Sequence, residues 1–121
     1  MGLKIAVKAH SEGDLALAEQ HYKRAYQQGD QNPVLYQNYG ALLRSTDRLQ
    51  EAIDWYEKGL KLFPDNVDIA ANYANSVRTT APSKAIEVYI DVFKAFLFSA
   101  NLATVLALFT SRAFIDSFAI V

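Results

Sequence analysis

Cysteine is absent from the 121-residue sequence, proline occurs three times and glycine five times, and the 12 basic residues nearly balance the 13 acidic ones. Without cysteine the chain has no disulfide, no thiolate nucleophile and no zinc site built on thiolates. The small number of prolines and glycines excludes a disordered or linker-rich protein. A net charge of −1 excludes nucleic-acid binding that depends on overall charge, so we expect no nucleic-acid partner.

Motifs of catalysis are also missing from the sequence. It contains no Gly-rich phosphate loop, no serine nucleophile elbow and no HExxH zinc motif. His10 and His21 lie too far apart in the sequence to form a local metal-binding pair. We therefore expect a protein that is not an enzyme and that binds no cofactor or metal. The N-terminal residues lack the long apolar stretch of a secretory signal, which favours a cytoplasmic protein.

Hydrophobic residues make up 51% of the chain and are concentrated at its C-terminal end. Residues 95–121 contain only two charged side chains, Arg112 and Asp116, and residues 95–111 contain none. This apolar tail therefore differs in character from the charged residues 1–94 before it.

Two series of residues repeat along the first part of the chain. An alanine followed four residues later by a tyrosine occurs at Ala18/Tyr22, Ala52/Tyr56 and Ala85/Tyr89, with spacings of 34 and 33 residues. A second series, half a period out of phase, consists of Ile5-Ala6, Tyr39-Gly40 and Tyr73-Ala74. Two interleaved series predict two structural elements per repeat.

Both elements have the periodicity of an α-helix. Tyr36, Tyr39, Gly40 and Leu43 occupy positions i, i+3, i+4 and i+7, which form one face of a helix. Asn32-Pro33 predicts a helix start, because asparagine is a good N-cap and proline is tolerated at the first helical position. Breaks are predicted at 63–66 and 79–82. The small residues predict close helix packing, with the tyrosines filling the core.

The second unit carries the fullest pattern, consisting of Tyr36, Tyr39, Gly40, Leu43, Ala52, Tyr56, Gly59 and Pro64. This pattern resembles the tetratricopeptide repeat, and the resemblance covers three units at about 2–31, 32–65 and 66–96. It implies an all-α fold, a right-handed superhelical α-solenoid of antiparallel helix pairs with a concave groove. It also implies a scaffold that binds a protein or peptide rather than a catalyst.

In this family the first helix of each unit lines the groove, which identifies candidate peptide-binding residues. Steps of 34 residues give two rows, Lys4–Asn38–Asn72 and His10–Arg44–Arg78. The candidate site consists of Lys4, Gln37, Asn38, Arg44, Asn72, Asn75 and Arg78. Carboxamides can both donate to and accept from a peptide main chain, and arginines favour a carboxylate. The alternative interpretation is an ordinary solvated surface.

Residues 97–121 are expected to form an apolar C-terminal helix or helices that cap the repeats or pair two chains as a homodimer. The candidate oligomerisation residues are Leu102, Val105, Leu108 and Phe109. Three alternatives stay open for this tail: a fragment of a longer protein, a membrane anchor, or an incorrect reading frame beyond about residue 95. Asn101, near the middle of the short uncharged stretch, is costly inside a membrane and argues against the anchor.

The function that follows is a non-catalytic protein–protein interaction scaffold that binds an extended peptide in its groove. One alternative is the substrate-recruiting arm of a larger transferase, because the asparagine row resembles the groove of repeats in O-linked glycosyltransferases. The other is an oligomerisation module whose groove is idle.

Overall fold

The computed structural model describes residues 2–99, apart from the side chains of residues 95, 96, 98 and 99, and within this part the chain forms helices and no strand. The helices are α1 (Gly2–Ser11), α2 (Leu15–Gln27), α3 (Pro33–Ser45), α4 (Leu49–Leu62), α5 (Val67–Val77) and α6 (Pro82–Ser99). The all-α prediction is confirmed. The predicted oligomerisation residues Leu102, Val105, Leu108 and Phe109 lie outside the described residues.

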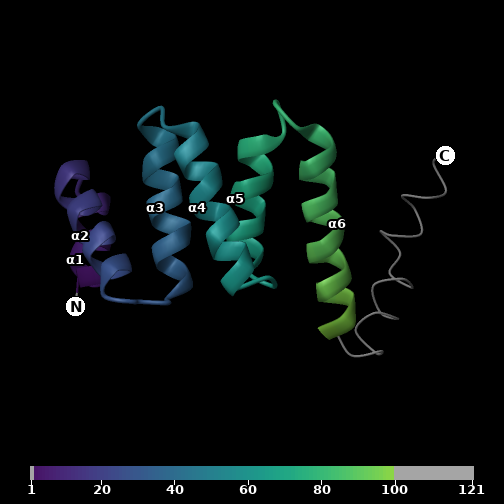
Figure 1. The fold of residues 1–121 in the computed structure, drawn as a ribbon, viewed down its shortest axis with the longest axis horizontal. Coiled ribbons are helices and arrows are strands. Elements are labelled where there is room, and N and C mark those ends of the chain that lie inside the picture. Colours follow the sequence, from purple (N-terminus) through teal and green to yellow (C-terminus); the bar gives the residue numbers. More distant parts are fainter. Residues whose placement is uncertain (1, 100–121) are drawn as a thin grey trace, which may run out of the picture.

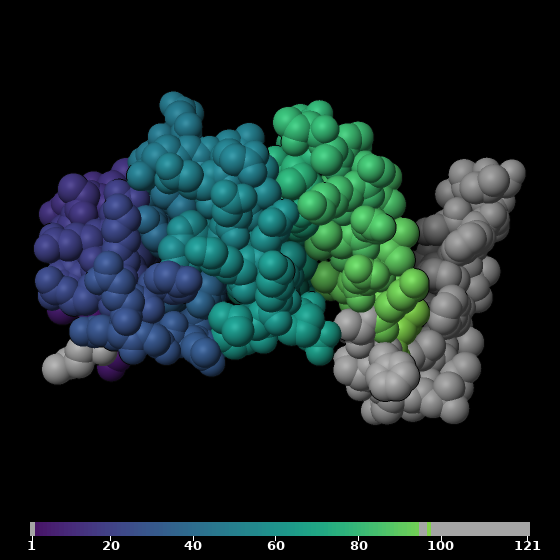
Figure 2. All heavy atoms as spheres, viewed as in Figure 1, coloured from purple at the N-terminus to yellow at the C-terminus, as the bar shows by residue number. Residues whose placement is uncertain are grey.

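Consecutive helices run in opposite directions and pair as hairpins, α1 with α2, α3 with α4 and α5 with α6 (Figure 1). The pairs follow one another in sequence order along an elongated body (Figure 2). Helix α3 also contacts α1 and α5. The second helices meet their neighbours through side chains, as Tyr26 of α2 does with Trp55 of α4. The first helices therefore form an inner layer and the second helices an outer layer. Because each pair contacts only its neighbours, the predicted solenoid is confirmed, and its right-handed sense stays a prediction.

The helices begin where their capping residues predict. The Asn32 side chain accepts a hydrogen bond from the backbone N–H of Val34 at 2.9 Å, and Pro33 is the first residue of α3. The Asn66 side chain caps α5 in the same way, accepting from the backbone N–H of Ile69 at 2.9 Å. These caps satisfy backbone N–H groups that have no partner inside the helix. The residues around Asn32 and Asn66 therefore determine where α3 and α5 begin.

The repeated alanines and tyrosines form the core of the first two helix pairs. Ala18, Tyr22, Ala52 and Tyr56 are all 0% exposed. Tyr22 of α2 stacks on Tyr39 of α3, with the ring centroids 5.4 Å apart. The tyrosine of one pair thus packs against the first helix of the next pair, which joins the units into one core.

The third tyrosine of the series does not follow this pattern, so the expectation that Tyr89 belongs to the core is wrong. Tyr89 is 48% exposed, although Ala85 beside it is buried. No helix follows α6 among the described residues, so none of these covers Tyr89 as α3 covers Tyr22. Together with Ile86, Ile90 and Phe93 it forms an exposed apolar stripe along α6.

Gly40 of α3 lies tightly against the Tyr56 ring of α4. A Cβ atom at this position would lie 2.3 Å from Cε1 and 2.6 Å from Cζ of Tyr56, closer than real Cβ atoms come to any neighbour. Glycine costs about 1 kcal/mol of helix stability relative to alanine. The buried Tyr56 ring occupies the space that the missing side chain leaves, and its packing offsets that cost.

We predict that Gly40→Ala lowers the free energy of unfolding by about 1 to 3 kcal/mol, although alanine is the better helix former. The Tyr56 ring is fully buried, so a Cβ at residue 40 would force the ring or the two helices to shift. Urea denaturation followed by circular dichroism measures the change. Gly2→Ala is the control and should be neutral, because a Cβ there lies 3.8 Å from the nearest atom, the carbonyl oxygen of His21. Unchanged stability of Gly40→Ala would contradict the close approach.

A cluster of three polar side chains joins the first helix pair to the second. The Glu19 carboxylate of α2 accepts hydrogen bonds from the Tyr39 hydroxyl of α3, at 3.0 Å, and from the Arg48 guanidinium at the start of α4. Burial alone would raise the pKa of Glu19, but the hydrogen bonds from Arg48 and Tyr39 outweigh it and hold the pKa below its ordinary value of 4.5. The cluster therefore stabilises the ionised carboxylate.

A cluster of the same composition joins the second pair to the third. The Glu57 carboxylate of α4 accepts from the Tyr73 hydroxyl of α5 at 3.0 Å and from the Lys84 ammonium of α6 at 3.3 Å. Hydrogen bonds with Tyr73 and Glu57 raise the pKa of Lys84. Both joints between pairs thus use a tyrosine, a glutamate and a basic residue.

We predict that Glu19→Gln lowers the free energy of unfolding at pH 7 by about 1 kcal/mol, the usual net value of such hydrogen bonds. Because the folded-state pKa of Glu19 lies below its unfolded value, its contribution is complete above about pH 4.5 and disappears as the pH falls through the folded pKa. The stability difference between wild type and variant should therefore shrink towards pH 3. Thermal unfolding from pH 7 to pH 3 measures it.

The control for this series is Glu12→Gln, which removes the same charge from an exposed residue that makes no side-chain hydrogen bond or ion pair within 2–99. It should leave stability at pH 7 nearly unchanged. An equal loss in both variants would show that net charge, rather than the Glu19 cluster, accounts for the effect.

Candidate functional site

The predicted groove residues lie on α1, α3 and α5, the helices of the inner layer. Gln37, Asn38 and Asn72 are half-buried, whereas Lys4, Arg44, Asn75 and Arg78 are exposed. None of them belongs to the hydrophobic core. The inner layer thus carries a polar surface over an apolar interior.

A pocket of about 330 Å³ lies where α3 and α5 meet above α4. Its walls are Ala41, Arg44 and Ser45 of α3, Asn72 of α5 and Tyr56 of α4. The pocket brings together two of the predicted groove residues, Arg44 and Asn72, from neighbouring units. It also adds Tyr56, which the sequence predicts only as a core residue.

The hydroxyl of Tyr56 is the unexpected element of this pocket. The ring is fully buried, and the carbon that carries the hydroxyl lies against Gly40 of α3. The hydroxyl is buried and has no hydrogen-bond partner within the described residues. Burial raises the pKa of Tyr56, and the positive charge of Arg44 acts in the opposite direction, which indicates that this guanidinium lies near the hydroxyl.

Tyr22, the corresponding tyrosine of the first pair, shows a satisfied hydroxyl in the same setting. Its oxygen lies 3.0 Å from Nδ1 of His10 on α1. Burial raises the pKa of Tyr22 to about 12, and a hydrogen bond with the Asn38 side chain of α3 acts in the opposite direction. The hydroxyl is therefore held by His10, a residue of its own helix pair.

The pocket around Tyr56 repeats this arrangement one unit later. Arg44 takes the place of the histidine, twelve residues before the tyrosine, and Asn72 takes the place of the asparagine, sixteen residues after it. This register is the signal in the sequence by which Tyr56 could have been found. The exchange of histidine for arginine changes the chemistry, because a guanidinium has no acceptor for the hydroxyl proton.

The pocket offers mainly hydrogen-bond donors to a ligand. Arg44 supplies up to five N–H groups, and the Asn72 carboxamide supplies two more. The Ser45 hydroxyl already donates to the carbonyl oxygen of Leu42 at 2.9 Å. The pocket wall contains no carboxylate. Such a site suits a main-chain carbonyl or a carboxylate.

The other predicted residues do not line this pocket. Asn75 of α5 is turned towards α6, where its side-chain oxygen accepts from the Tyr89 hydroxyl at 3.4 Å. Lys4, Gln37, Asn38 and Arg78 lie elsewhere along the inner layer. The structure thus brings together two of the seven predicted residues in one cavity and spreads the rest along three helices.

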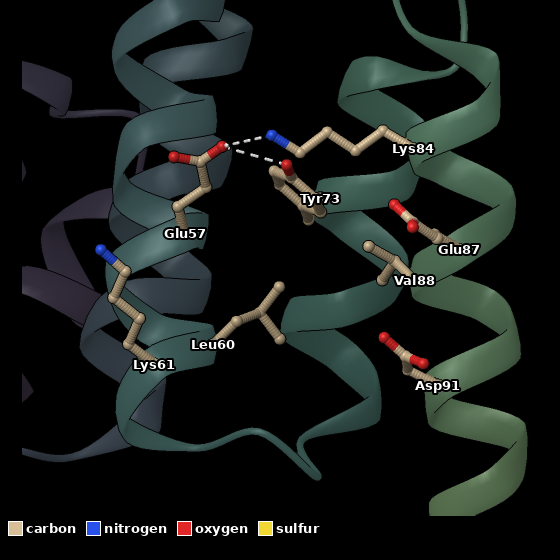
Figure 3. Close-up of a pocket in the computed structure, with 8 residues that line it drawn as sticks. All are labelled: Glu57, Leu60, Lys61, Tyr73, Lys84, Glu87, Val88 and Asp91. Carbon is tan, nitrogen blue, oxygen red and sulfur yellow. Dashed lines mark hydrogen bonds and ion pairs between the residues drawn. The ribbon is translucent and has the colours of Figure 1, made fainter.

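A second hollow of about 360 Å³ lies between α4 and α6, with Tyr73 of α5 at its side (Figure 3). Its walls are Glu57, Leu60, Lys61, Tyr73, Lys84, Glu87, Val88 and Asp91. Figure 3 shows Glu57 pointing towards Tyr73 and Lys84, while Glu87 and Asp91 line the α6 side. No sequence pattern predicts this hollow, and its central charges already bind each other as the joint between the second and third pairs.

The part of the chain that the structure describes contains neither a cluster of metal-ligating side chains nor a membrane-spanning helix. Residues 2–99 contain no group of three metal-ligating side chains. Over the same range, no helix is long and apolar enough to cross a membrane.

A family model described as tetratricopeptide repeat matches residues 9–75, which is more than half of the chain. The chain therefore belongs to the tetratricopeptide repeat family, as its helix pairs and repeated residues predict. No curated protein matches the chain. Repeats of this family generally mediate protein–protein interactions and are typically non-catalytic scaffolds.

Proposed function

We propose that this protein is a non-catalytic scaffold that binds an extended peptide segment of a partner protein across α1, α3 and α5. The observation that carries the proposal is the pocket between α3 and α5, where Arg44 and Asn72 lie beside the unpartnered Tyr56 hydroxyl. Arg44 is exposed and Asn72 is half-buried, so a ligand can reach both side chains, whereas Tyr56 is 0% exposed.

The spacing of the inner helices suits an extended peptide. Packed helices lie about 8–10 Å apart, and an extended chain advances about 3.3 Å per residue. Each first helix therefore spans about three peptide residues, and three first helices span about nine. Asn38 of α3 and Asn72 of α5 carry half-buried carboxamides. These carboxamides can bind main-chain groups of the peptide about three residues apart.

The chemistry of the pocket supports binding rather than catalysis. A nucleophilic serine needs a neighbouring base, and the pocket wall contains neither histidine nor carboxylate. Ser45 instead donates its proton to a backbone carbonyl. The alternative function, a substrate-recruiting arm of a larger transferase, would use the same groove. Peptide binding is therefore common to the scaffold and to the transferase arm.

We predict that Asn38→Ala combined with Asn72→Ala weakens peptide binding at least tenfold. The ligand is a peptide selected by the full chain from a random ten-residue library, and fluorescence anisotropy measures its Kd. Each lost main-chain contact removes a hydrogen bond worth about 1 kcal/mol, so two together give roughly this change.

The matched control is Gln20→Ala combined with Gln27→Ala, which removes two carboxamides from exposed positions of α2 in the outer layer. This variant should bind the selected peptide like wild type. Equal affinity of the Asn38/Asn72 variant and wild type, with both folded, would show that the inner layer is only a solvated surface.

Self-association is a second candidate function, and the exposed stripe on α6 favours it. Ile86, Tyr89, Ile90 and Phe93 are each 47–59% exposed and lie on one face of the last described helix. Glu87 and Lys94 are seven residues apart and therefore share one side of α6. In an antiparallel pair of α6 helices centred between Ile90 and Asp91, Glu87 of one chain lies beside Lys94 of the other. A second copy of the chain thus offers both apolar and charge complementarity in a closed two-fold dimer.

We predict that the full chain is a dimer in sedimentation velocity experiments and that Ile90→Lys combined with Phe93→Lys makes it a monomer. Two charges on the apolar stripe would have to be desolvated in the dimer, which is unfavourable. Ile5→Lys combined with Leu17→Lys is the control, because these residues are 47% and 38% exposed at the opposite end of the molecule. A monomeric wild type, or a dimer that survives the α6 charges, would exclude this interface.

A further inference from the structure

We propose that the hollow between α4 and α6 is a second interaction site, which takes an aromatic side chain and a neighbouring lysine or arginine from a partner protein. The hollow lies between two second helices, in the outer layer of the molecule. It is therefore separate from the polar inner layer, and the proposal goes beyond the peptide binding assigned to that layer.

The corresponding space in the joint between the first and second pairs is filled by three aromatic side chains. Tyr26 of α2 meets Trp55 of α4 edge to face, with the ring centroids 4.8 Å apart. Trp55 also packs against Tyr36 of α3, at a centroid distance of 5.4 Å. The Lys58 ammonium lies over two of these rings, 5.2 Å from the centroid of Tyr26 and 5.0 Å from that of Trp55. Aromatic packing and a cation over the rings thus close this joint.

The joint between the second and third pairs lacks all three rings. At steps of 34, 34 and 33 residues, the tyrosines and the tryptophan are replaced by Leu60, Ala70 and Val88. These three smaller side chains line a cavity of about 220 Å³ between α4, α5 and α6. Leu60 and Val88 also line the hollow of about 360 Å³ shown in Figure 3. The hollow is therefore the space that the first joint fills with its own aromatic rings.

The charge at this place is reversed as well. Asp91 stands where the repeat register places Lys58 in the unit before, and it lies one helical turn after Glu87. Figure 3 shows both carboxylates pointing from α6 towards α4, and neither forms an ion pair within residues 2–99. Lys61 on the facing wall extends along α4, with its ammonium away from these carboxylates (Figure 3). The α6 side of the hollow can therefore accept a positive charge.

A partner segment with an aromatic ring next to a basic residue matches both features. The ring supplies the packing that Leu60 and Val88 lack, and the base can pair with Glu87 and Asp91. A second copy of this chain is a poorer match. The exposed apolar stripe with which two copies would pair lies on the opposite side of α6 from Val88 and Asp91, since each residue turns a helix by about 100°.

The test uses three amidated ten-residue peptides of glycine and serine that differ only in their three central residues, which are Lys-Trp-Lys, Lys-Ala-Lys or Glu-Trp-Glu. Methyl NMR signals of Leu60 and Val88 in the labelled full chain report binding at the hollow, and titration gives the Kd. We expect the Lys-Trp-Lys peptide to shift these signals and to bind about fivefold more tightly than either of the others. Main-chain contacts with the inner layer are the same for all three peptides, so a difference in Kd reports on the side chains.

A first pair of variants tests the charges. Glu87→Gln combined with Asp91→Asn should weaken binding of the Lys-Trp-Lys peptide about threefold and abolish its advantage over Glu-Trp-Glu. The matched control is Glu12→Gln combined with Asp47→Asn, which removes two charges from exposed residues that form no ion pair within 2–99 and do not line the hollow. The control should keep the preference of the wild type.

A further variant tests the space. Leu60→Tyr combined with Val88→Trp restores the aromatic pair of the first joint, so it should fill the hollow and abolish the advantage of Lys-Trp-Lys over Lys-Ala-Lys. Far-UV circular dichroism checks that the variant is folded. The charge variants alter only exposed side chains, so they test the site independently of this substitution.

The outcomes separate this inference from the proposed function. Equal Kd values for the three peptides would overturn the outer site and leave peptide binding by the inner layer intact. A preference for Lys-Trp-Lys that survives both the filled hollow and the loss of the two carboxylates would also overturn it, because the peptide would then bind elsewhere. Shifts of Leu60 and Val88 that depend on protein concentration without any peptide would show that a second copy occupies the hollow, which again contradicts the proposal.

Discussion

Tyr56 lies across Gly40 so closely that a side chain at residue 40 would begin 2.3 Å from the aromatic ring. This contact sets the distance between α3 and α4, the central helix pair, against which the first and third pairs pack. Tyr56 also lines the pocket between α3 and α5. A single constraint therefore shapes both the core and the candidate binding site, because the glycine that permits tight packing also places a polar atom below the groove.

Contacts within a helix pair are mainly apolar, and polar clusters add to the contacts between pairs. Apolar packing of small residues against tyrosines holds each pair together, while the Glu19 and Glu57 clusters join one pair to the next. These clusters draw only Tyr39 and Tyr73 from the first helices, and Arg44 and Asn72 of the inner layer take no part in them. A solenoid built in this way can present a row of donors and acceptors to a ligand without weakening its own core.

Much of this fold could be predicted from the sequence, because helix period, N-caps and small-residue positions are local signals. Asn32, Gly40 and the buried alanines behave as their positions predict. Tyr89 does not, since its burial depends on a neighbour after α6 rather than on its own repeat. The joints were not predictable either, because Glu19 and Glu57 are about one helical turn out of the 34-residue register. In the site, the inner helices and Arg44 with Asn72 were predictable, whereas the Tyr56 hydroxyl required the comparison with Tyr22 in three dimensions.

The central claim is that the polar inner layer binds a peptide. Chemical-shift mapping of the labelled full chain with a peptide selected from a random library tests it most directly. We predict that the side-chain amide signals of Asn38 and Asn72 and the Nε–H of Arg44 shift on binding, while the backbone amides of Gln20 and Gln27 on α2 do not. Shifts confined to the hollow around Glu57 and Lys84, with the inner layer unchanged, would contradict it.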